Sequence, residues 1–275
     1  MLGSLDCMQI SWDMCEKSLH GQYTGKEEKP TIVLEAIADY NLYFHHVSVG
    51  YPGSLNDINV LNISTLIHKL THTINESESE SIPYTISDEE FTRVFYLLDG
   101  IYPSWSRFVK TIGFPVNQKQ KSYSKWQEAC RKDIERAFGV LQKRIQILRN
   151  GFKKDTLETI NDIVVTCIII HNMCVSERVC GSISGYKADH AIDAEDNFDE
   201  FDPRNPNYDN EIASDDKSSE VSNLEEWRLI YIQSWQTLND PVEHVRLRNA
   251  ITENVWRSVN EYMENTGRNL VPNSN

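Results

Sequence analysis

Three acidic side chains in this chain have the type and the setting that divalent-metal chemistry needs: Asp6, Asp99 and Glu135. Each lies within, at the end of or on the flank of an apolar element. Carboxylates are the hard oxygen ligands that Mg²⁺ and Mn²⁺ take in proteins. If folding brings the three side chains together, they can serve the cleavage of phosphodiester bonds.

The elements that carry the two aspartates are predicted to be strands. Residues 2–10 are mostly apolar with the first aspartate in their middle, and residues 92–98 end just before the second. Two β-branched and aromatic runs, at 31–39 and 42–49, are separated by a short polar turn and predict a hairpin. We therefore expect three adjacent strands, with a fourth strand that delivers Asp99.

Glu135 lies on a predicted amphipathic helix over residues 123–148, where apolar side chains recur at i, i+3, i+4 and i+7. At about 100° per residue, its carboxylate falls at the edge of the apolar face. Residues 156–177 are apolar almost all round and predict a buried helix. Two terminal helices are expected over residues 224–235 and 241–262.

The composition fits a globular protein. The chain has 275 residues, of which 40% are hydrophobic, enough to bury a core. Its start shows no basic stretch followed by an apolar run, and the apolar tract at 163–170 falls short of the roughly 20 residues that span a bilayer. The 6 cysteines show no paired CxxC spacing. We therefore expect an intracellular protein with reduced thiols and no membrane contact.

The net charge of -14 is distributed unevenly. Residues 117–154 hold about eleven Lys and Arg side chains against three acidic ones, a local basic footprint of the kind that binds phosphate. Residues 189–226 hold about fourteen acidic side chains against two basic ones, which is typical of a solvated segment. The predicted organisation is an α/β domain over 1–180, an acidic disordered linker over 181–222 and a C-terminal helical segment over 223–265.

Several polar residues allow a structural and a functional interpretation. Asp57 follows Ser54 at the spacing of a helix capping box, and we favour capping over a role in a site. For His45 and His46 we favour packing over metal binding, and His171 is expected to be a hydrogen-bonded core histidine. The basic run could be a solvated helix face, but DNA contact is favoured because Glu135 lies within it.

A series of motifs gives this chain its resemblance to the Harbinger-type (PIF/Harbinger) DDE transposases and the nucleases derived from them, over roughly residues 3–177. The motifs occur in the family's order: Gly3-Ser-Leu-Asp-Cys-Met8, Gly21-Gln-Tyr-Thr-Gly-Lys26, Pro30-Thr-Ile-Val-Leu-Glu-Ala36, Pro52-Gly-Ser-Leu-Asn-Asp-Ile-Asn-Val-Leu61, Asp99-Gly-Ile-Tyr-Pro103, Glu135-Arg-Ala-Phe-Gly-Val-Leu-Gln142 and His171-Asn-Met173.

The resemblance implies an α/β fold with an RNase H-like mixed sheet and flanking helices. Asp6, Asp99 and Glu135 would be its DDE triad and would hold two divalent ions, Mg²⁺ or Mn²⁺. The implied activity is that of a nuclease or transposase core that cuts double-stranded DNA and can transfer a strand. The side chains expected to hold backbone phosphates are Lys125, Lys132, Arg136, Lys143 and Arg144. The resemblance also implies the nucleus as the site of action, after import from the cytoplasm. It implies a separate Myb-like DNA-binding partner and allows an oligomer.

The chain departs from the family's pattern in two respects. The family carries a helix-turn-helix or similar segment before the catalytic core, whereas five residues precede Asp6, and its first motif usually has His where this chain has Gln9. The alternative expectation is therefore a catalytically inactive, truncated or domesticated relic that binds DNA or protein. A third hypothesis is a structure-selective nuclease related to RNase H. Cleavage of RNA–DNA hybrids would identify such an enzyme.

Overall fold

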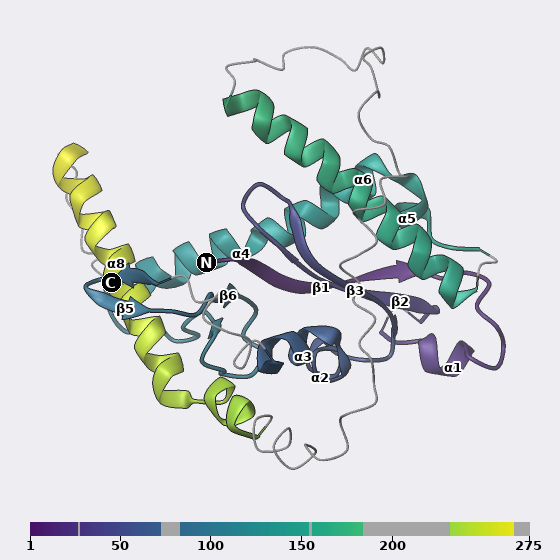
Figure 1. Cartoon of the computed structure of the whole chain (residues 1–275), viewed down its shortest axis with the longest axis horizontal. Helices are drawn as coiled ribbons and strands as arrows, with labels where there is room; N and C mark the ends of the chain where they lie inside the picture. The colour runs from purple at the N-terminus through teal and green to yellow at the C-terminus, as the bar shows by residue number, and fades with distance from the viewer. Residues whose placement is uncertain (27, 73–82, 154–155, 184–231, 267–275) are drawn as a thin grey trace, which may run out of the picture.

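A mixed sheet forms the centre of the molecule in this computed structural model, which describes residues 1–26, 28–72, 83–153, 156–183 and 232–266 (Figure 1). Its strands are β1 (Gly3–Ser11), β2 (Thr31–Ala38), β3 (Phe44–Pro52), β6 (Tyr96–Leu97) and β7 (Phe108–Val109). The strand order is β3-β2-β1-β6-β7. Neighbours among β1, β2 and β3 are antiparallel, whereas β1, β6 and β7 run parallel. The prediction of an α/β fold with a mixed sheet is confirmed.

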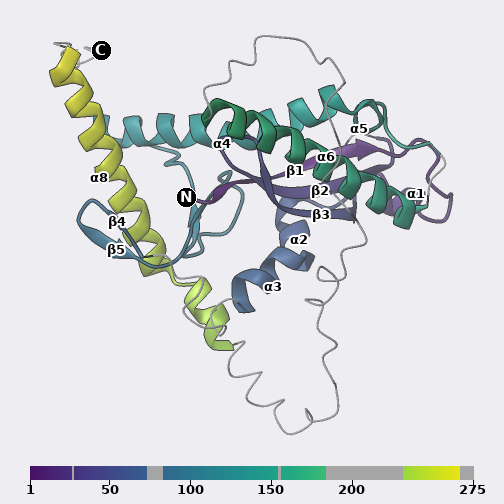
Figure 2. The same ribbon diagram turned by 45° about the horizontal axis from the view of Figure 1, so that its top comes forward.

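Helices cover both faces of the sheet. The helices are α1 (His20–Tyr23), α2 (Asp57–Ile63), α3 (Thr65–His72), α4 (Gln118–Arg144), α5 (Gln146–Asn150), α6 (Leu157–Ile183) and α8 (Pro241–Thr266). Figures 1 and 2 show α4, α5 and α6 on one face and α2 and α3 on the other. A separate hairpin of β4 (Tyr84–Ile86) and β5 (Glu89–Phe91) lies beside α8.

The two faces of β1 explain this layering. Ile10 packs with Leu34 of β2 and with Ile134 and Leu141 of α4, in a cluster of buried side chains that also includes α6. Leu5 points to the other face and packs with residues of α2 and α3. Because side chains alternate along a strand, β1 is covered on both faces, and its polar residues are enclosed with it.

The chain between 54 and 98 differs from the sequence prediction. The strand expected over 92–98 is only two residues long, because Glu89–Phe91 pairs with β4 instead, across a turn in which Ser87 and Asp88 both have positive φ. That backbone is typical of the turns that join two-residue hairpins. The single helix expected after Ser54 is divided into α2 and α3, because Ser64 is extended and bonds back to the Leu61 carbonyl oxygen.

The prediction that the helix after residue 156 is buried all round is wrong. One face of α6 packs on the sheet, where the buried His171 meets the Leu42 carbonyl oxygen at 2.9 Å, as expected for a core histidine. The other face leaves Val165, Ile169, Ile170 and Met173 exposed. The stretch Leu157–Arg178 is long and apolar enough to cross a membrane, a test that core helices of soluble proteins also pass. Its packing on β3 favours a core helix.

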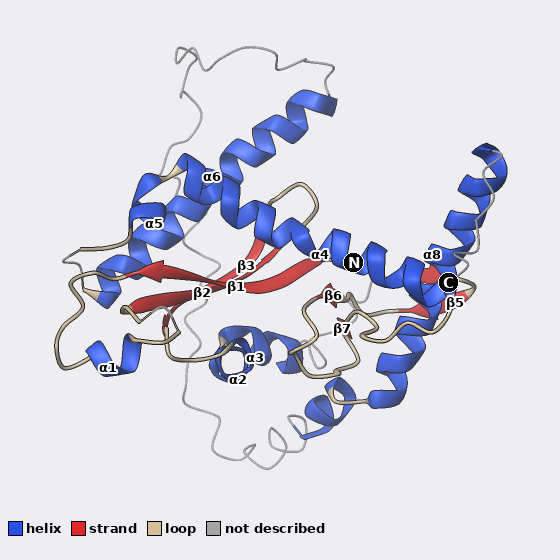
Figure 3. Cartoon of the chain, turned by 180° about the vertical axis from the view of Figure 1, so that it is seen from behind, coloured by secondary structure: helices blue, strands red, loops and turns tan. Residues whose placement is uncertain are grey.

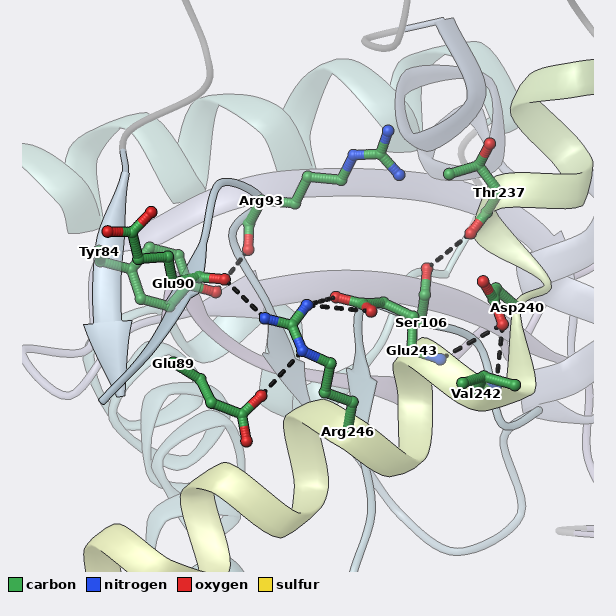
Figure 4. Close-up of polar contacts among 10 residues, drawn as sticks. All are labelled: Tyr84, Glu89, Glu90, Arg93, Ser106, Thr237, Asp240, Val242, Glu243 and Arg246. Carbon is green, nitrogen blue, oxygen red and sulfur yellow. Dashed lines mark hydrogen bonds and ion pairs between the residues drawn. The ribbon is translucent and has the colours of Figure 1, made fainter. Parts of the chain in front are cut away.

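Helix α8 is attached to the hairpin and to α4 by ion pairs and by an apolar face. Arg246 donates to Glu89, to Glu243 and to the Glu90 carbonyl oxygen, each at 2.8 Å, and Asp240 caps the first turn of the helix (Figure 4). The apolar face of α8 is buried with side chains of β5, β6, β7 and α4; it consists of Leu247, Ala250, Ile251 and Val255.

The acidic linker predicted over 181–222 lies, from residue 184 on, outside the described residues. Residues 232–238 are helical, as is α8, so the expectation of C-terminal helices is confirmed for the part of the chain that the structure describes. The domain boundaries stay a prediction.

We predict that Ile251→Ala lowers the free energy of unfolding by about 2–4 kcal/mol, because it removes a side chain that is 3% exposed in the α8 contact. Val242→Ala, at a position that is 74% exposed on the same helix, is the matched control and should cost less than about 0.5 kcal/mol. Urea unfolding of both variants measures the difference. Equal effects would show that α8 does not unfold together with the core.

Candidate functional site

Asp6 lies on β1, and Asp99 lies two residues after the end of β6, the strand that runs parallel to β1. The ladder between β1 and β6 pairs Gly3 with Tyr96 and Ser4 with Leu97 and ends there. Asp99 then begins a turn, in which its carbonyl oxygen accepts from the Tyr102 N–H. Each carboxylate accepts a hydrogen bond from the backbone N–H of the next residue, at 2.9 Å for Asp6 and 2.6 Å for Asp99.

Helix α4, which carries Glu135, crosses the sheet and contacts β1 and β6 (Figure 3). Ser4 Oγ donates to the Cys130 carbonyl oxygen at 3.1 Å, one helical turn before Glu135. Arg131 then joins the two predicted ligands, with its Nη1 at 3.1 Å from Glu135 Oε1 and 3.8 Å from Asp6 Oδ2. The structure thus brings Asp6 and Glu135 together around one guanidinium, whereas Asp99 is linked to them only through Asp57, which interacts with both aspartates.

Burial dominates the electrostatics of Asp6. It raises the pKa of Asp6 from 3.8 to about 6, while the Cys7 N–H opposes the shift. Asp57 and Glu135 raise it further by repulsion, and Arg131 lowers it. A carboxylate that is enclosed among like charges favours the approach of a cation.

Asp57 is a further acid of this site, and its expected capping role is wrong. The cap of α2 is Asn56, whose side chain accepts from the Asn59 N–H at 2.8 Å, while the Ser54 hydroxyl donates to the Gln22 carbonyl oxygen. Asp57 is instead the first residue of α2. Burial raises its pKa, against a hydrogen bond from the Cys7 thiol and the charge of Lys26, while Asp99 and Glu35 raise it by repulsion.

Polar side chains of β1 and β2 lie close to Asp57, among them Cys7 and Glu35. Cys7 Sγ lies 3.7 Å from the hydroxyl of Tyr102, and Lys110 donates to the Tyr102 carbonyl oxygen at 2.8 Å. Glu35 is fully buried on β2, with one carboxylate oxygen 3.5 Å from Nε2 of the buried His46. His46 is buried, as the packing interpretation expects, and its ring also faces the Glu35 carboxylate. Glu35 is the one charged residue of β2, and every residue of this strand is buried. The sequence pattern alone therefore gave no signal that Glu35 lies near the site.

An open cleft of about 840 Å³ is lined by two of the acids, Asp6 and Glu135, and not by Asp99 or Asp57. Its lining is polar for the most part and includes Asp6, Gln9, Lys29, Glu135 and Gln142. Gln9, at the position where the family usually has His, accepts from the Thr31 hydroxyl at 3.0 Å through its Oε1. The cleft therefore offers carboxylates for cations and the Lys29 ammonium for an anion.

The acids fit a divalent metal in kind and in backbone placement. They are hard oxygen donors on β1, after β6 and on the crossing α4. Burial makes the charge of Asp6 costly without a cation, whereas Asp99 and Glu135 are exposed. Within the described ranges, no three His, Cys, Asp or Glu side chains converge closely enough to hold a metal ion. In this arrangement Asp6 and Asp99 each accept a hydrogen bond from the backbone N–H of the following residue, and Glu135 pairs with Arg131.

The five predicted DNA-binding residues lie on the exposed outside of α4. At about 100° per residue, four of them form one stripe opposite the buried face of the helix, and Arg144 lies to its side. Arg136 also pairs with Asp133. The stripe consists of Lys125, Lys132, Arg136 and Lys143. It points away from the acids, so its charges can reach a DNA backbone only beside the cleft and not at its centre.

Comparisons with known proteins give one family and one relative. A family model described as "Plant transposon protein" matches residues 1–180. "Protein ALP1-like" of Arabidopsis thaliana is 25% identical over 150 residues, which is 54% of this chain and 36% of that protein. The chain thus matches about a third of the length of this curated relative. No solved structure matches.

We predict that Asp6→Asn stabilises the metal-free protein at neutral pH. Because the pKa of Asp6 is raised from 3.8 to about 6, the native protein binds this proton more tightly than the unfolded chain, and stability is lost as the pH rises through that interval. The substitution should therefore add about 2 kcal/mol at pH 7.5 and almost nothing at pH 4.

Urea unfolding at both pH values with a chelator present measures this difference, and Asp162→Asn on the exposed side of α6 is the control. A loss of stability at pH 7.5 would contradict the assignment of Asp6 as a buried, poorly compensated charge.

Proposed function

Because this chain belongs to the plant transposon protein family, a family of Harbinger-type transposases, we propose that its described core is the catalytic part of a metal-dependent DNA endonuclease or transposase. The observation that carries the proposal is the arrangement of Asp6 on β1 and Glu135 on α4 around Arg131, with Asp99 following the parallel strand β6. The strand order, with three antiparallel strands followed by two parallel ones, supports an RNase H-like core.

Each part of the site has a separate task in this proposal. Asp6, Asp99 and Glu135 hold Mg²⁺ or Mn²⁺, two ions in all, which when bound neutralise the charge that develops on a phosphodiester during displacement. Lys29 at the cleft binds a backbone phosphate there. The basic stripe of α4 holds phosphates outside the cleft, fixing the position of the duplex without reading its bases.

The setting of this activity is part of the proposal. A DNA substrate places the protein in the nucleus, after import from the cytoplasm. The Myb-like partner and an oligomer stay predictions. A core of this kind that has lost its chemistry would still bind DNA through the basic stripe, so DNA binding does not separate an active enzyme from a relic.

We predict Mn²⁺-dependent nicking of supercoiled plasmid by the purified protein. Asp99→Asn and Glu135→Gln should each lower the nicking rate by at least about a hundredfold, because each removes a ligand charge at the reacting phosphate. Glu177→Gln, on the exposed part of α6, is the matched control and should leave the rate unchanged. Nicking that survives both site variants belongs to a contaminant. Absence of nicking in the wild type favours the inactive relic.

We also predict that Lys132→Ala together with Lys143→Ala weakens duplex DNA binding equally for all sequences. The slope of log affinity against log salt should fall in magnitude by roughly 2, because two phosphate contacts are lost. Lys17→Ala with Arg257→Ala removes the same charge from other surfaces and is the control. Titrations in Ca²⁺ at several salt concentrations measure both slopes. Identical slopes in the two double variants would exclude the stripe as a DNA contact.

A further inference from the structure

Arg131 occupies the space between two of the three predicted ligands. It lies one helical turn before Glu135 on α4 and is 18% exposed. Its Nη1 contacts Glu135 Oε1 at 3.1 Å and faces Asp6 Oδ2 at 3.8 Å. Among the described residues, no other cation forms an ion pair with either carboxylate.

A contact between i and i+4 on a helix surface needs no special function and contributes little. The contact with Asp6 is different, because Asp6 belongs to β1 and is itself only 21% exposed. One guanidinium therefore holds together a strand and a helix through the acids that they carry. Removing a charge of this kind leaves buried carboxylates without compensation.

The surroundings of Asp6 explain why a cation is required there. Asp57 and Glu135 repel its charge, and Asp99 in turn repels Asp57. Arg131 supplies one positive charge to these acids, and its Nη1 faces both Asp6 and Glu135. A divalent ion supplies the same compensation with a shorter reach and a higher charge.

We propose that Arg131 is a resident cation, which holds Asp6 and Glu135 in the metal-free site and competes with the divalent ion for the same carboxylates. Metal binding then displaces the guanidinium from Asp6 and Glu135. Arg131 acts through the ligands and is a positioning residue. The inference rests on the proposed function in one respect, that the acids bind a metal.

The sign of one measurement separates this role from simple support of Glu135. If Arg131 competes, Arg131→Gln should bind Mn²⁺ about tenfold more tightly than the wild type, since an opposite charge this close stabilises a carboxylate by about one pKa unit or more. If Arg131 only holds Glu135 in place, its loss should weaken Mn²⁺ binding. Arg257→Gln, which removes a surface arginine paired with Asp88, is the control.

Calorimetric titration with Mn²⁺ in the absence of DNA provides the affinities, and thermal melting provides a second readout. Without metal, Arg131→Gln should melt below the wild type, and saturating Mn²⁺ should raise its melting temperature by more than that of the wild type. Arg131→Lys keeps the positive charge on a shorter side chain, which holds the ammonium further from the two acids, so its affinity should lie between the two. Should Arg131→Gln fail to fold, the lysine variant carries the comparison.

Equal or weaker Mn²⁺ binding by the folded Arg131 variants, with the wild type binding normally, overturns the role of Arg131 alone. Absence of Mn²⁺ binding in the wild type and in every variant overturns the metal site and the proposed function together. Tighter binding by Arg131→Gln, with no change in Arg257→Gln, supports the proposal even where no nicking is seen.

Discussion

The position of every group in the site depends on how α4 is fixed across the parallel strands. Gln127 is almost fully buried in α4, and its side-chain NH₂ donates to the carbonyl oxygens of Leu98 and Val109, at 3.0 and 3.1 Å, where β6 and β7 end. Two-residue strands offer a helix little apolar area, so these hydrogen bonds add to the apolar packing of α4 on β1. Together the two kinds of contact fix where α4 crosses the strands, and with it the positions of Glu135 and Arg131.

Local signals in the sequence sufficed for much of this arrangement. Asp6, Asp99 and Glu135 could be singled out because motifs and hydrophobic spacing are properties of neighbouring residues. For the same reason β1, β2, β3 and most of α4 could be predicted. The short strands could not be located, because two residues carry no periodicity and β7 exists only as a partner of β6. Whether a segment pairs with β1 or with a hairpin is decided by the rest of the fold.

The charged residues that the sequence did not assign to the site share one property. Their role depends on how distant segments of the chain pair and pack. Asp57 matches a capping box by spacing, yet the loop at Gln22 takes the Ser54 hydroxyl and leaves Asn56 as the cap. Glu35 is one polar residue in an apolar strand until the pairing of Cys7 with Glu35 places it beside the site. Arg131 is one basic residue of many until α4 docks.

The cost of this cluster is itself an argument about function. An aspartate that serves only a turn or a cap can stay near the surface, where its charge costs little. Here Asp6 and Asp57 are both partly buried, burial raises the pKa of each, and each is also repelled by neighbouring acids. Such an arrangement destabilises the fold unless a cation is present. Since Arg131 compensates only part of the charge, a site built to take a further cation explains the geometry better than structure alone.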